Sequence, residues 1–304
     1  MTTIPVRQIL CPVDRSETAH HAGLRALAFA RSTGAQLTFL HVVPPLRIPT
    51  GEPAVWIEQP PLEQDERPIR SWMSERFGGA SAGAVTPQFL IRVGVPAKEV
   101  LACAAALNAD LIVIGTHGTG GFERLMLGSV TEKVLRQALC AVLTVPPHDI
   151  QTSSLPFARV LCAIDFSECS LHALEFAMTT ALDSGALLML AHVLEWPWEE
   201  PPAPAFDELP PVEAAALGLY RRQRERTVVA RLRALEPEGL AERCELRVVH
   251  GRSYTEILRL AATERADLVV LGVRGRSAVD LAVFGSTTNQ VVRHATCPVL
   301  TIKH

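Results

Sequence analysis

The sequence predicts an α/β protein built as two tandem doubly wound domains, each a five-stranded parallel sheet flanked by four helices. Three observations predict this fold class. The 304 residues suffice for two domains of about 150 residues each. One pattern occurs twice along the chain, and within each copy short β-branched runs alternate with longer helical segments, as in βαβ units.

The internal repeat extends over nearly the whole chain. ILCPVDRSE near residue 9 matches VLCAIDFSE near residue 160, and matched residues are first 151 and later 157 positions apart. The second copy therefore carries six extra residues, all between His192 and Gly251. We infer two homologous domains, 1–147 and 157–304, joined near Pro146 to Pro156. The matched pairs are Asp14 with Asp165, Gly34 with Gly185, His41 with His192, Gly94 with Gly251, Gly115 with Gly272, and Cys140 with Cys297.

The elements of each copy follow from the spacing of apolar residues. Short β-branched runs predict strands, and longer segments with apolar residues at helical spacing predict helices. The expected strands of the first copy are Gln8–Val13, Gln36–Val43, Thr86–Val93, Leu111–Gly115 and Ala141–Val145. The expected helices start near Ser16, Leu62, Pro96 and Ser129 in the first copy, and near Ser167, Val212, Ser253 and Ser286 in the second.

A Pro-rich segment follows the second strand of each copy. The segments are PPLRIPTGEP in the first copy and WPWEEPPAPAFDELPP in the second. Both are too long for an ordinary connection between a strand and a helix. We expect each to form either a mobile flap or a surface for a partner.

Composition restricts the classes of function. With 48% hydrophobic and 20% charged residues and a mean hydropathy of +0.20, the chain is typical of globular proteins. Its net charge of -3, from 29 Lys and Arg against 32 Asp and Glu, gives no global positive field for nucleic acid or an anionic membrane. No apolar run reaches the roughly 18 residues of a membrane-spanning helix.

The location is expected to be cytoplasmic. The first residues lack the long apolar stretch and small-residue cleavage site of a signal peptide. The seven cysteines are odd in number, are never spaced C-x-x-C, and mostly stand in apolar runs. These features favour buried, reduced thiols.

The fourth strand of each copy leads into the pattern G-x-x-G-x9-G-S. GTHGTGGFERLMLGS begins at Gly115 and GVRGRSAVDLAVFGS at Gly272. Glycine permits a positive φ or a close approach of the backbone to a ligand, and Ser129 and Ser286 start helices whose free N–H groups attract anions. The carboxyl ends of strands near the switch point are where open parallel sheets bind ligands. The pattern predicts a phosphate cradle in each copy.

Other interpretations of these residues stay open. The glycines are alternatively turn and cap residues, and the serines alternatively N-caps. Asp14 and Asp165 end the first strands, where they either accept hydrogen bonds from a nucleoside or cap a helix through Asp-x-x-Glu.

Two further groups of residues near the cradles have alternative roles. Arg274 and Arg276 flank Gly275 in the second copy and would pair with phosphate, where the first copy has His117 and Thr119; the alternative is a solvated loop. His41 and His192 stand at matched strand ends without a cluster of metal ligands, so they are interpreted as structural, and no protein-held metal site is expected.

These residues together resemble the universal stress protein family, in a tandem form whose two domains cover almost the whole chain. The resemblance rests on PVD and AID at the first strand ends, LHVV and AHVL at strand two, GVPAKEVL and GRSYTEIL entering helix three, and both glycine motifs. In this family the glycine motif marks members that bind ATP, so the resemblance implies ATP, accompanied by Mg²⁺. From the residues alone, the argument reaches only a phosphate-bearing nucleotide.

The resemblance also implies roles for individual positions. The aspartates would face the nucleoside, Val42 and Val193 would offer backbone groups to adenine, and the glycines and serines would hold phosphates. The second copy departs from the first by having Ala163 in place of Pro12. The residues implied for the first ATP are Pro12, Asp14, Val42, Gly115, Gly118, Gly128, Ser129 and Val130. Those for the second are Asp165, Val193, Gly272, Gly275, Gly285, Ser286 and Thr287, with Arg276 added as a charge partner.

The family resemblance suggests an assembly as well. With the strand order 3-2-1-4-5, the fifth strands AVLTV and PVLTI lie at sheet edges, apolar and without protective charges. We expect the two edges to pair within the chain as a pseudo-dimer, and a further homodimer is expected.

Three functions compete. The first is an ATP-binding regulator of a stress response with at most slow hydrolysis, acting on an unknown protein partner. The second is an ATP-using transferase, although the chain has no Walker motif, no G-x-G-x-x-G after strand one and no G-x-S-x-G. The third is a docking module that needs no nucleotide. Glycine motifs in both halves favour the first, and any enzymatic activity would be weak.

Overall fold

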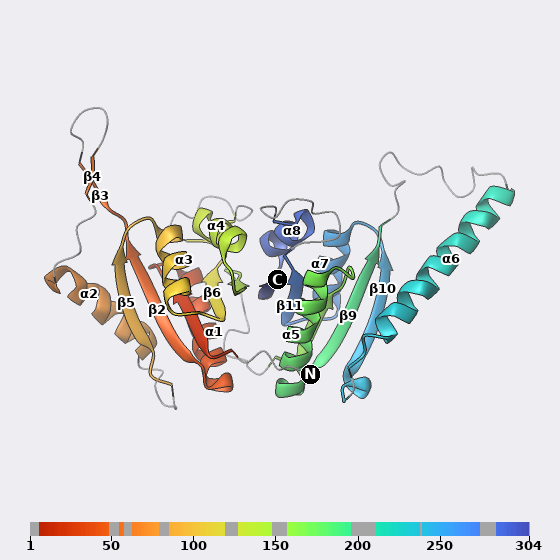
Figure 1. Cartoon of the computed structure of the whole chain (residues 1–304), viewed down its shortest axis with the longest axis horizontal. Helices are drawn as coiled ribbons and strands as arrows, with labels where there is room; N and C mark the ends of the chain where they lie inside the picture. Colours follow the sequence, from red (N-terminus) through yellow and green to blue (C-terminus); the bar gives the residue numbers. More distant parts are fainter. Residues whose placement is uncertain are drawn as a thin grey trace.

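The computed structural model of the chain describes residues 6–48, 55–57, 63–78, 85–118, 127–147, 157–195, 211–237, 239–273 and 284–303. The two copies lie side by side and share one ten-stranded sheet, in the order β10-β9-β8-β11-β12-β7-β6-β1-β2-β5 (Figure 1). Each half has the order 3-2-1-4-5 with four α-helices, so the predicted fold class is confirmed.

The elements begin and end close to their predicted bounds. The first half contains β1 (Gln8–Pro12), α1 (Glu17–Thr33), β2 (Gln36–Val43), α2 (Glu63–Met73), β5 (Gln88–Val93), α3 (Pro96–Ala106), β6 (Leu111–Gly115), α4 (Ser129–Gln137) and β7 (Ala141–Val145). The second contains β8 (Arg159–Ala163), α5 (Glu168–Ser184), β9 (Leu187–Leu194), α6 (Pro211–Arg233), β10 (Cys244–His250), α7 (Ser253–Thr263), β11 (Leu268–Gly272), α8 (Ser286–His294) and β12 (Val299–Ile302). A π-helical turn, Ser74–Gly78, extends α2.

The Pro-rich segments are described only in part. β3 (Leu46–Ile48), in the first segment, and β4 (Val55–Ile57), just after it, form a small antiparallel sheet that the sequence did not predict. Residues 49–54 between these strands, and residues 196–210 of the second segment, lie outside the described residues.

The helix that follows the first strand has the same end signals in both halves. The hydroxyl of Ser16 accepts the N–H of Ala19, and the hydroxyl of Ser167 accepts the N–H of Ser170. Both helices end at a glycine in the left-handed region, Gly34 with φ 72° and Gly185 with φ 71°. Such serine caps and terminal glycines are the strongest local helix boundaries in a sequence.

Helices cover both faces of the sheet, with one core on each side. One core joins α1, α2, α5 and α6 to the sheet, and the other joins α3, α4, α7 and α8 to the opposite face. Both cores contain residues of both halves, because the sheet is continuous. Strands with an apolar layer on each face are fully buried, which explains their nearly unbroken apolar runs.

The two halves join where β7 pairs antiparallel with β12. The hydroxyl of Thr144 donates to the carbonyl of Val299 at 3.1 Å, and the hydroxyl of Thr301 donates to the carbonyl of Val142 at 3.1 Å. Both threonines are buried. The expected pairing of the fifth strands within the chain is therefore confirmed.

A buried arginine adds a second contact between the halves. Arg25 of α1 is fully buried, and its guanidinium carbon lies 5.5 Å from the ring centre of Phe157, just before β8. Nearby, burial raises the pKa of Asp267, whereas N–H groups of Ala158 and Arg159 and the charge of Arg25 oppose that rise. The start of the second half is thus held against a helix of the first.

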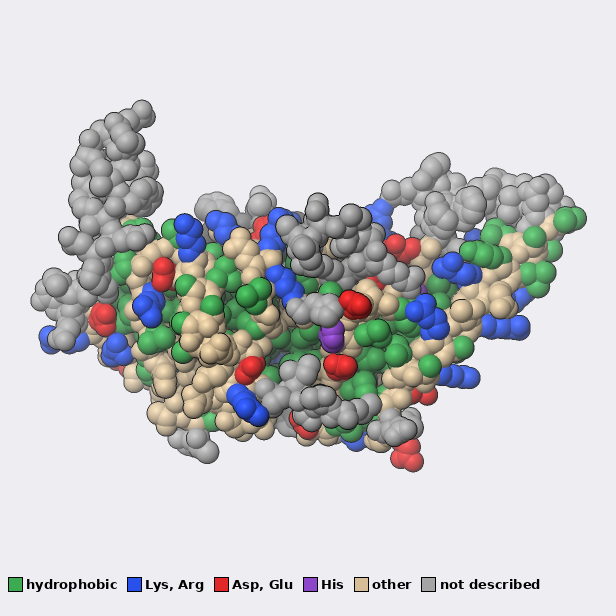
Figure 2. All heavy atoms as spheres, in the orientation of Figure 1, with side chains coloured by type: hydrophobic (Ala, Val, Ile, Leu, Met, Phe, Trp, Pro, Cys, Tyr) green, Lys and Arg blue, Asp and Glu red, His purple; other side chains and the backbone are tan. Residues whose placement is uncertain are grey.

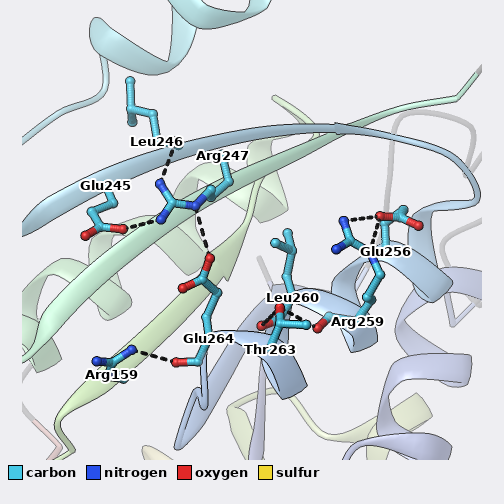
Figure 3. A network of polar contacts seen from close by, with 9 residues as sticks. All are labelled: Arg159, Glu245, Leu246, Arg247, Glu256, Arg259, Leu260, Thr263 and Glu264. Carbon is cyan, nitrogen blue, oxygen red and sulfur yellow. Dashed lines mark hydrogen bonds and ion pairs between the residues drawn. The ribbon is translucent and has the colours of Figure 1, made fainter.

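The outer edges of the sheet, β5 and β10, carry polar protection. Arg70 of α2 donates to the carbonyl of Phe89 in β5 at 3.1 Å. In β10, Arg247 contacts Glu245 at 2.5 Å and Glu264, just after α7, at 3.3 Å (Figure 3). Charges on an edge strand oppose pairing with another chain.

Helix α6 extends away from the body of the second half. Val228 and Leu232 near its end are buried, whereas residues 222–227 are exposed. Figure 2 shows basic side chains, all of them arginines, along this helix. Within the described part of the chain, no helix combines the length and apolarity needed to cross a membrane.

The threonine bonds between the halves predict a measurable loss of stability. Thr144→Val and Thr301→Val each remove one buried hydroxyl bond at nearly constant shape, so each should lower the free energy of unfolding by about 1 kcal/mol. Urea unfolding measures this. Thr38→Val is the control, because Thr38 is also buried in a sheet strand but makes no side-chain hydrogen bond within the described structure. Equal losses in all three variants would contradict the prediction.

Candidate functional site

A cavity of about 740 Å³ lies at the carboxyl ends of β1, β2 and β6, next to the start of α4. This is the switch point of the first half, where β1 lies between β2 and β6. All eight residues expected around the first ligand line this cavity: Pro12, Asp14, Val42, Gly115, Gly118, Gly128, Ser129 and Val130. The structure therefore brings together residues that are far apart in the sequence.

Two hydrogen bonds close the ends of the first glycine segment onto each other. The N–H of Gly128 donates to the carbonyl of Thr116 at 2.8 Å, and the hydroxyl of Thr131 donates to the carbonyl of Gly115 at 2.7 Å. They fix the start of α4 beside the end of β6. The second half repeats both contacts, from Gly285 to Val273 and from Thr288 to Gly272.

The glycines of the motif have different reasons to be glycine. A Cβ at Gly115 would lie 2.8 Å from the methyl of Thr18 and 3.1 Å from its backbone, so this position is needed for packing of α1. Gly272 has the same relation to the backbone of Cys169. A Cβ at Gly118 would instead approach the Asp14 Oδ2 atom, at 2.8 Å. The described motif glycines do not have positive φ, so close approach is what requires them.

The start of α4 differs from the N-cap interpretation of its serine. Gly128 is the N-cap and Ser129 the first helical residue, and no side chain of the described residues caps the helix. At this end the first N–H groups, including those of Ser129 and Val130, have no acceptor within the helix. They line the cavity, where the helix dipole favours an anion. Helix α8 begins in the same way at Gly285.

Asp14 holds the turn that leads into α1. Its Oδ1 accepts the N–H of Ser16 at 2.9 Å and the hydroxyl of Ser16 at 2.5 Å, while Ser16 itself caps the helix. The Asp-x-x-Glu capping alternative is therefore wrong, because the cap is the serine. Asp165 makes the same two bonds to Ser167.

The backbone of Val42 points past the end of β1. The carbonyl of Leu40 accepts the N–H of Val13 on the β1 side, and that of Val43 accepts the N–H of Gly94 on the β5 side. Backbone groups alternate sides along a strand. Val42 therefore faces the β1 side, where pairing has already ended at Leu40. Its N–H and carbonyl are directed at the cavity, which it lines.

Two histidines line the cavity with different roles. The Nδ1–H of His41 donates to the carbonyl of Val13 at 2.8 Å, and His192 makes the matching bond to Ile164. His117 contacts the Thr116 hydroxyl through Nδ1, and its buried Nε2 has no hydrogen-bond partner among the described residues. Burial lowers the pKa of His117.

The second half keeps the same framework. Among its predicted residues, Asp165, Val193, Gly272, Gly285, Ser286 and Thr287 belong to the described part of the chain. Val193 lies two residues beyond Ala191, which accepts the N–H of Ile164, so it faces past the end of β8 as Val42 does past β1. Gly275 and Arg276, like the neighbouring Arg274, lie outside the described residues.

Both halves of the chain match the sequence model of one protein family. The sequence model of the Universal stress protein family matches residues 5–146 and 156–303. The chain belongs to the universal stress protein family. Its two Usp domains correspond to the two halves of the ten-stranded sheet.

Other universal stress proteins resemble the chain over its full length or over one half. It is 28% identical to one from Mycolicibacterium smegmatis, over 97% of this chain and 96% of the relative. It is 32% identical to one from Methanocaldococcus jannaschii, over 46% of this chain and 81% of the relative. The crystal structure of a universal stress protein from Archaeoglobus fulgidus has the same fold, with 23% identity, 98% coverage of each chain and a TM-score of 0.65.

Among the cavity residues that sequence reasoning missed, the polar ones are Arg15 and Thr131. Thr131 carried a signal, because its match at Thr288 also follows the motif serine by two positions. Arg15 carried a different signal, because the two copies differ at this position: the second copy has Phe166 between the matched aspartate and serine.

The contrast between two motif glycines predicts different costs for the same substitution. Gly115→Ala should lower the free energy of unfolding by about 1–3 kcal/mol, because its Cβ meets backbone of α1 that cannot move away. Gly118→Ala should cost less, since its Cβ meets the end of one side chain. Urea unfolding compares the two, and a larger loss for Gly118→Ala would contradict the assignment.

The neutral state of His117 predicts a pH dependence of stability. Its pKa in the folded state lies below the ordinary 6.5, so the unfolded chain binds more protons near and below that pH. The stability contribution is present above pH 6.5 and is lost as the pH falls. Unfolding free energies at pH 7.5 and 5.0 should differ less in His117→Gln than in the wild type. His20, whose pKa is also lowered, is common to both proteins and cancels.

Proposed function

We propose that the chain is an ATP-binding regulator of a stress response, with at most slow hydrolysis. One observation carries the proposal. The eight residues that the family motif implies for the first nucleotide, drawn from β1, β2, β6 and α4, line a single cavity. Its volume of about 740 Å³ falls within the range of small-molecule sites, about 300–1,000 Å³.

The donors and acceptors around the cavity suit a nucleotide. The free N–H groups at the start of α4 match phosphate oxygens, and Gly118 leaves space beside Asp14. The N–H and carbonyl of Val42, which make no backbone hydrogen bond within the described structure, face the cavity, as backbone recognition of adenine requires. The buried Nε2 of His117 gives a further polar atom that a ligand can satisfy. Mg²⁺ would enter with the phosphates, which supply its usual ligands together with water.

The same groups favour holding the nucleotide over turning it over. Oδ1 of Asp14 accepts two hydrogen bonds from Ser16, an arrangement that suits a positioned ligand contact more than a proton-abstracting base. In a regulator, occupancy by ATP would shift the population of a conformation that a protein partner recognises.

We further propose that the protein is cytoplasmic. Its chains, each with β7 paired to β12 internally, would associate as a homodimer. The seven cysteines are free thiols, and five of them are buried. Burial raises the pKa of both Cys140 and Cys244 to about 11, so even these two half-buried thiols resist ionisation. Thiols that form no disulfide suit a reducing compartment.

The decisive experiment counts the nucleotide that the protein retains. The protein is purified under native conditions and denatured, and released nucleotide is identified by chromatography and mass spectrometry. We expect about two adenine nucleotides per chain, and the ratio of ATP to ADP reports hydrolysis. If none is released and none binds on addition of ATP with Mg²⁺, the proposal fails and the docking module becomes the better function.

A motif variant assigns the nucleotide to the cavity. Gly118→Val should roughly halve the retained nucleotide with little loss of fold, because its side chain occupies the space beside Asp14. Gly275→Val should do the same for the second half. Unchanged nucleotide content in both variants would show that the cradles are assigned wrongly.

A further inference from the structure

The two halves differ at the residue that follows the aspartate of strand one. Asp14 and Ser16 make the same hydrogen bonds as Asp165 and Ser167. Between them, however, the first half has Arg15 and the second has Phe166. Phe166 has a positive φ of 62°, which is a genuine outlier for a bulky residue. The φ of Arg15 is not positive. The difference is therefore local and affects both side chain and backbone.

An arginine and an aromatic ring have exchanged places between the halves. In the first half, the guanidinium carbon of Arg15 lies 5.8 Å from the ring centre of Trp72 on α2. In the second half, the guanidinium carbon of Arg231 on α6 lies 3.8 Å from the ring centre of Phe166. Trp72 and Arg231 each stand directly before a fully buried residue, Met73 on α2 and Leu232 on α6.

The matched histidines lie beside the aromatic ring in each half. The ring centres of His41 and Trp72 are 5.6 Å apart, and those of His192 and Phe166 are 4.9 Å apart. The cluster of one arginine, one aromatic and one histidine is thus retained, while the positive charge moves from the outer helix to the loop after strand one.

In the first half this exchange places a cation at the cavity. Arg15 lines the cavity and is exposed, and within the described structure its side chain makes no hydrogen bond or ion pair. Its distance to Trp72 is near the limit of about 6 Å for an attractive contact between a cation and a ring. Among the described residues that line the cavity, the other formally charged side chain is Asp14.

In the second half the same position is filled by an apolar ring. Phe166 packs against both His192 and the guanidinium of Arg231, and these contacts support its unusual backbone conformation. This position therefore presents no cation of its own.

We propose that Arg15 is an anion-binding residue of the first-half cavity, which contacts a phosphate of the bound nucleotide and makes the two halves unequal sites. The inference rests on the proposed function, since it concerns the same ligand. A guanidinium has five donors in a planar fork that matches phosphate oxygens. Contact with Trp72 limits the positions that the Arg15 side chain adopts without using any of those donors.

The test compares ligands that differ in their number of phosphates. Isothermal titration calorimetry of the full chain, first freed of nucleotide, is run with ATP, ADP, AMP and adenosine. Arg15→Met should weaken ATP at one class of site about tenfold and leave adenosine within about twofold of the wild type. The control is Arg67→Met, which removes the same charge from an exposed position of α2 that does not line the cavity.

Each outcome decides between the alternatives. Selective loss of ATP affinity in Arg15→Met, with wild-type behaviour in Arg67→Met, supports the assignment. Equal losses for ATP and adenosine would show a structural role for Arg15, and no loss would show that it does not touch the ligand; either result overturns the inference alone. If the wild type binds none of the four ligands, the proposed function itself fails.

Discussion

The antiparallel pairing of β7 with β12 is the contact on which the rest of the molecule depends. In a single half the fifth strand would be an apolar edge, open to pairing with any other chain. Because both strands come from copies of one pattern, each presents the complement of the other, as in a two-fold symmetric dimer. The two reciprocal hydrogen bonds, from Thr144 to Val299 and from Thr301 to Val142, show this complementarity. The duplication therefore converts two exposed edges into the centre of one sheet.

Joining the halves at the centre allows their outer parts to diverge. The strands near the β7–β12 pairing and the described ends of the glycine segments keep the same contacts in both copies. The outer helices differ, because α2 has 11 residues and α6 has 23. Arg25 shows that asymmetry also reaches the linker. The residue of α5 that matches Arg25 is Phe176. The contact of Arg25 with Phe157, at the start of the second half, therefore belongs to the first copy alone among the described residues. The exchange of Arg15 with Phe166 follows the same rule at the site, because its partners come from α2 and α6.

Local signals made most of the fold predictable, and long-range contacts explain what was missed. Strands such as Leu111–Gly115 are continuous apolar runs with layers on both faces, so the prediction matched their bounds. The strands β3 and β4 have only three residues each, so they carry too short a pattern to be predicted. Ser129 resembled an N-cap, but the bond from Gly128 to Thr116 across the glycine segment moves the cap one residue earlier. The contact of Arg15 with Trp72 joins residues 57 positions apart, which no local pattern encodes.

The spacing of the glycine motif combines two separate requirements. Gly115 serves the packing of α1, and Gly128 lets the backbone approach the carbonyl of Thr116, where a Cβ would lie 3.2 Å away. Both needs arise from closing the loop against the sheet and would exist without any ligand. At Gly118, in contrast, the atom nearest to an added Cβ belongs to a side chain of the cavity, Oδ2 of Asp14 at 2.8 Å. The outer glycines of the motif therefore report the fold, and the middle glycine is the position that most directly reports the ligand.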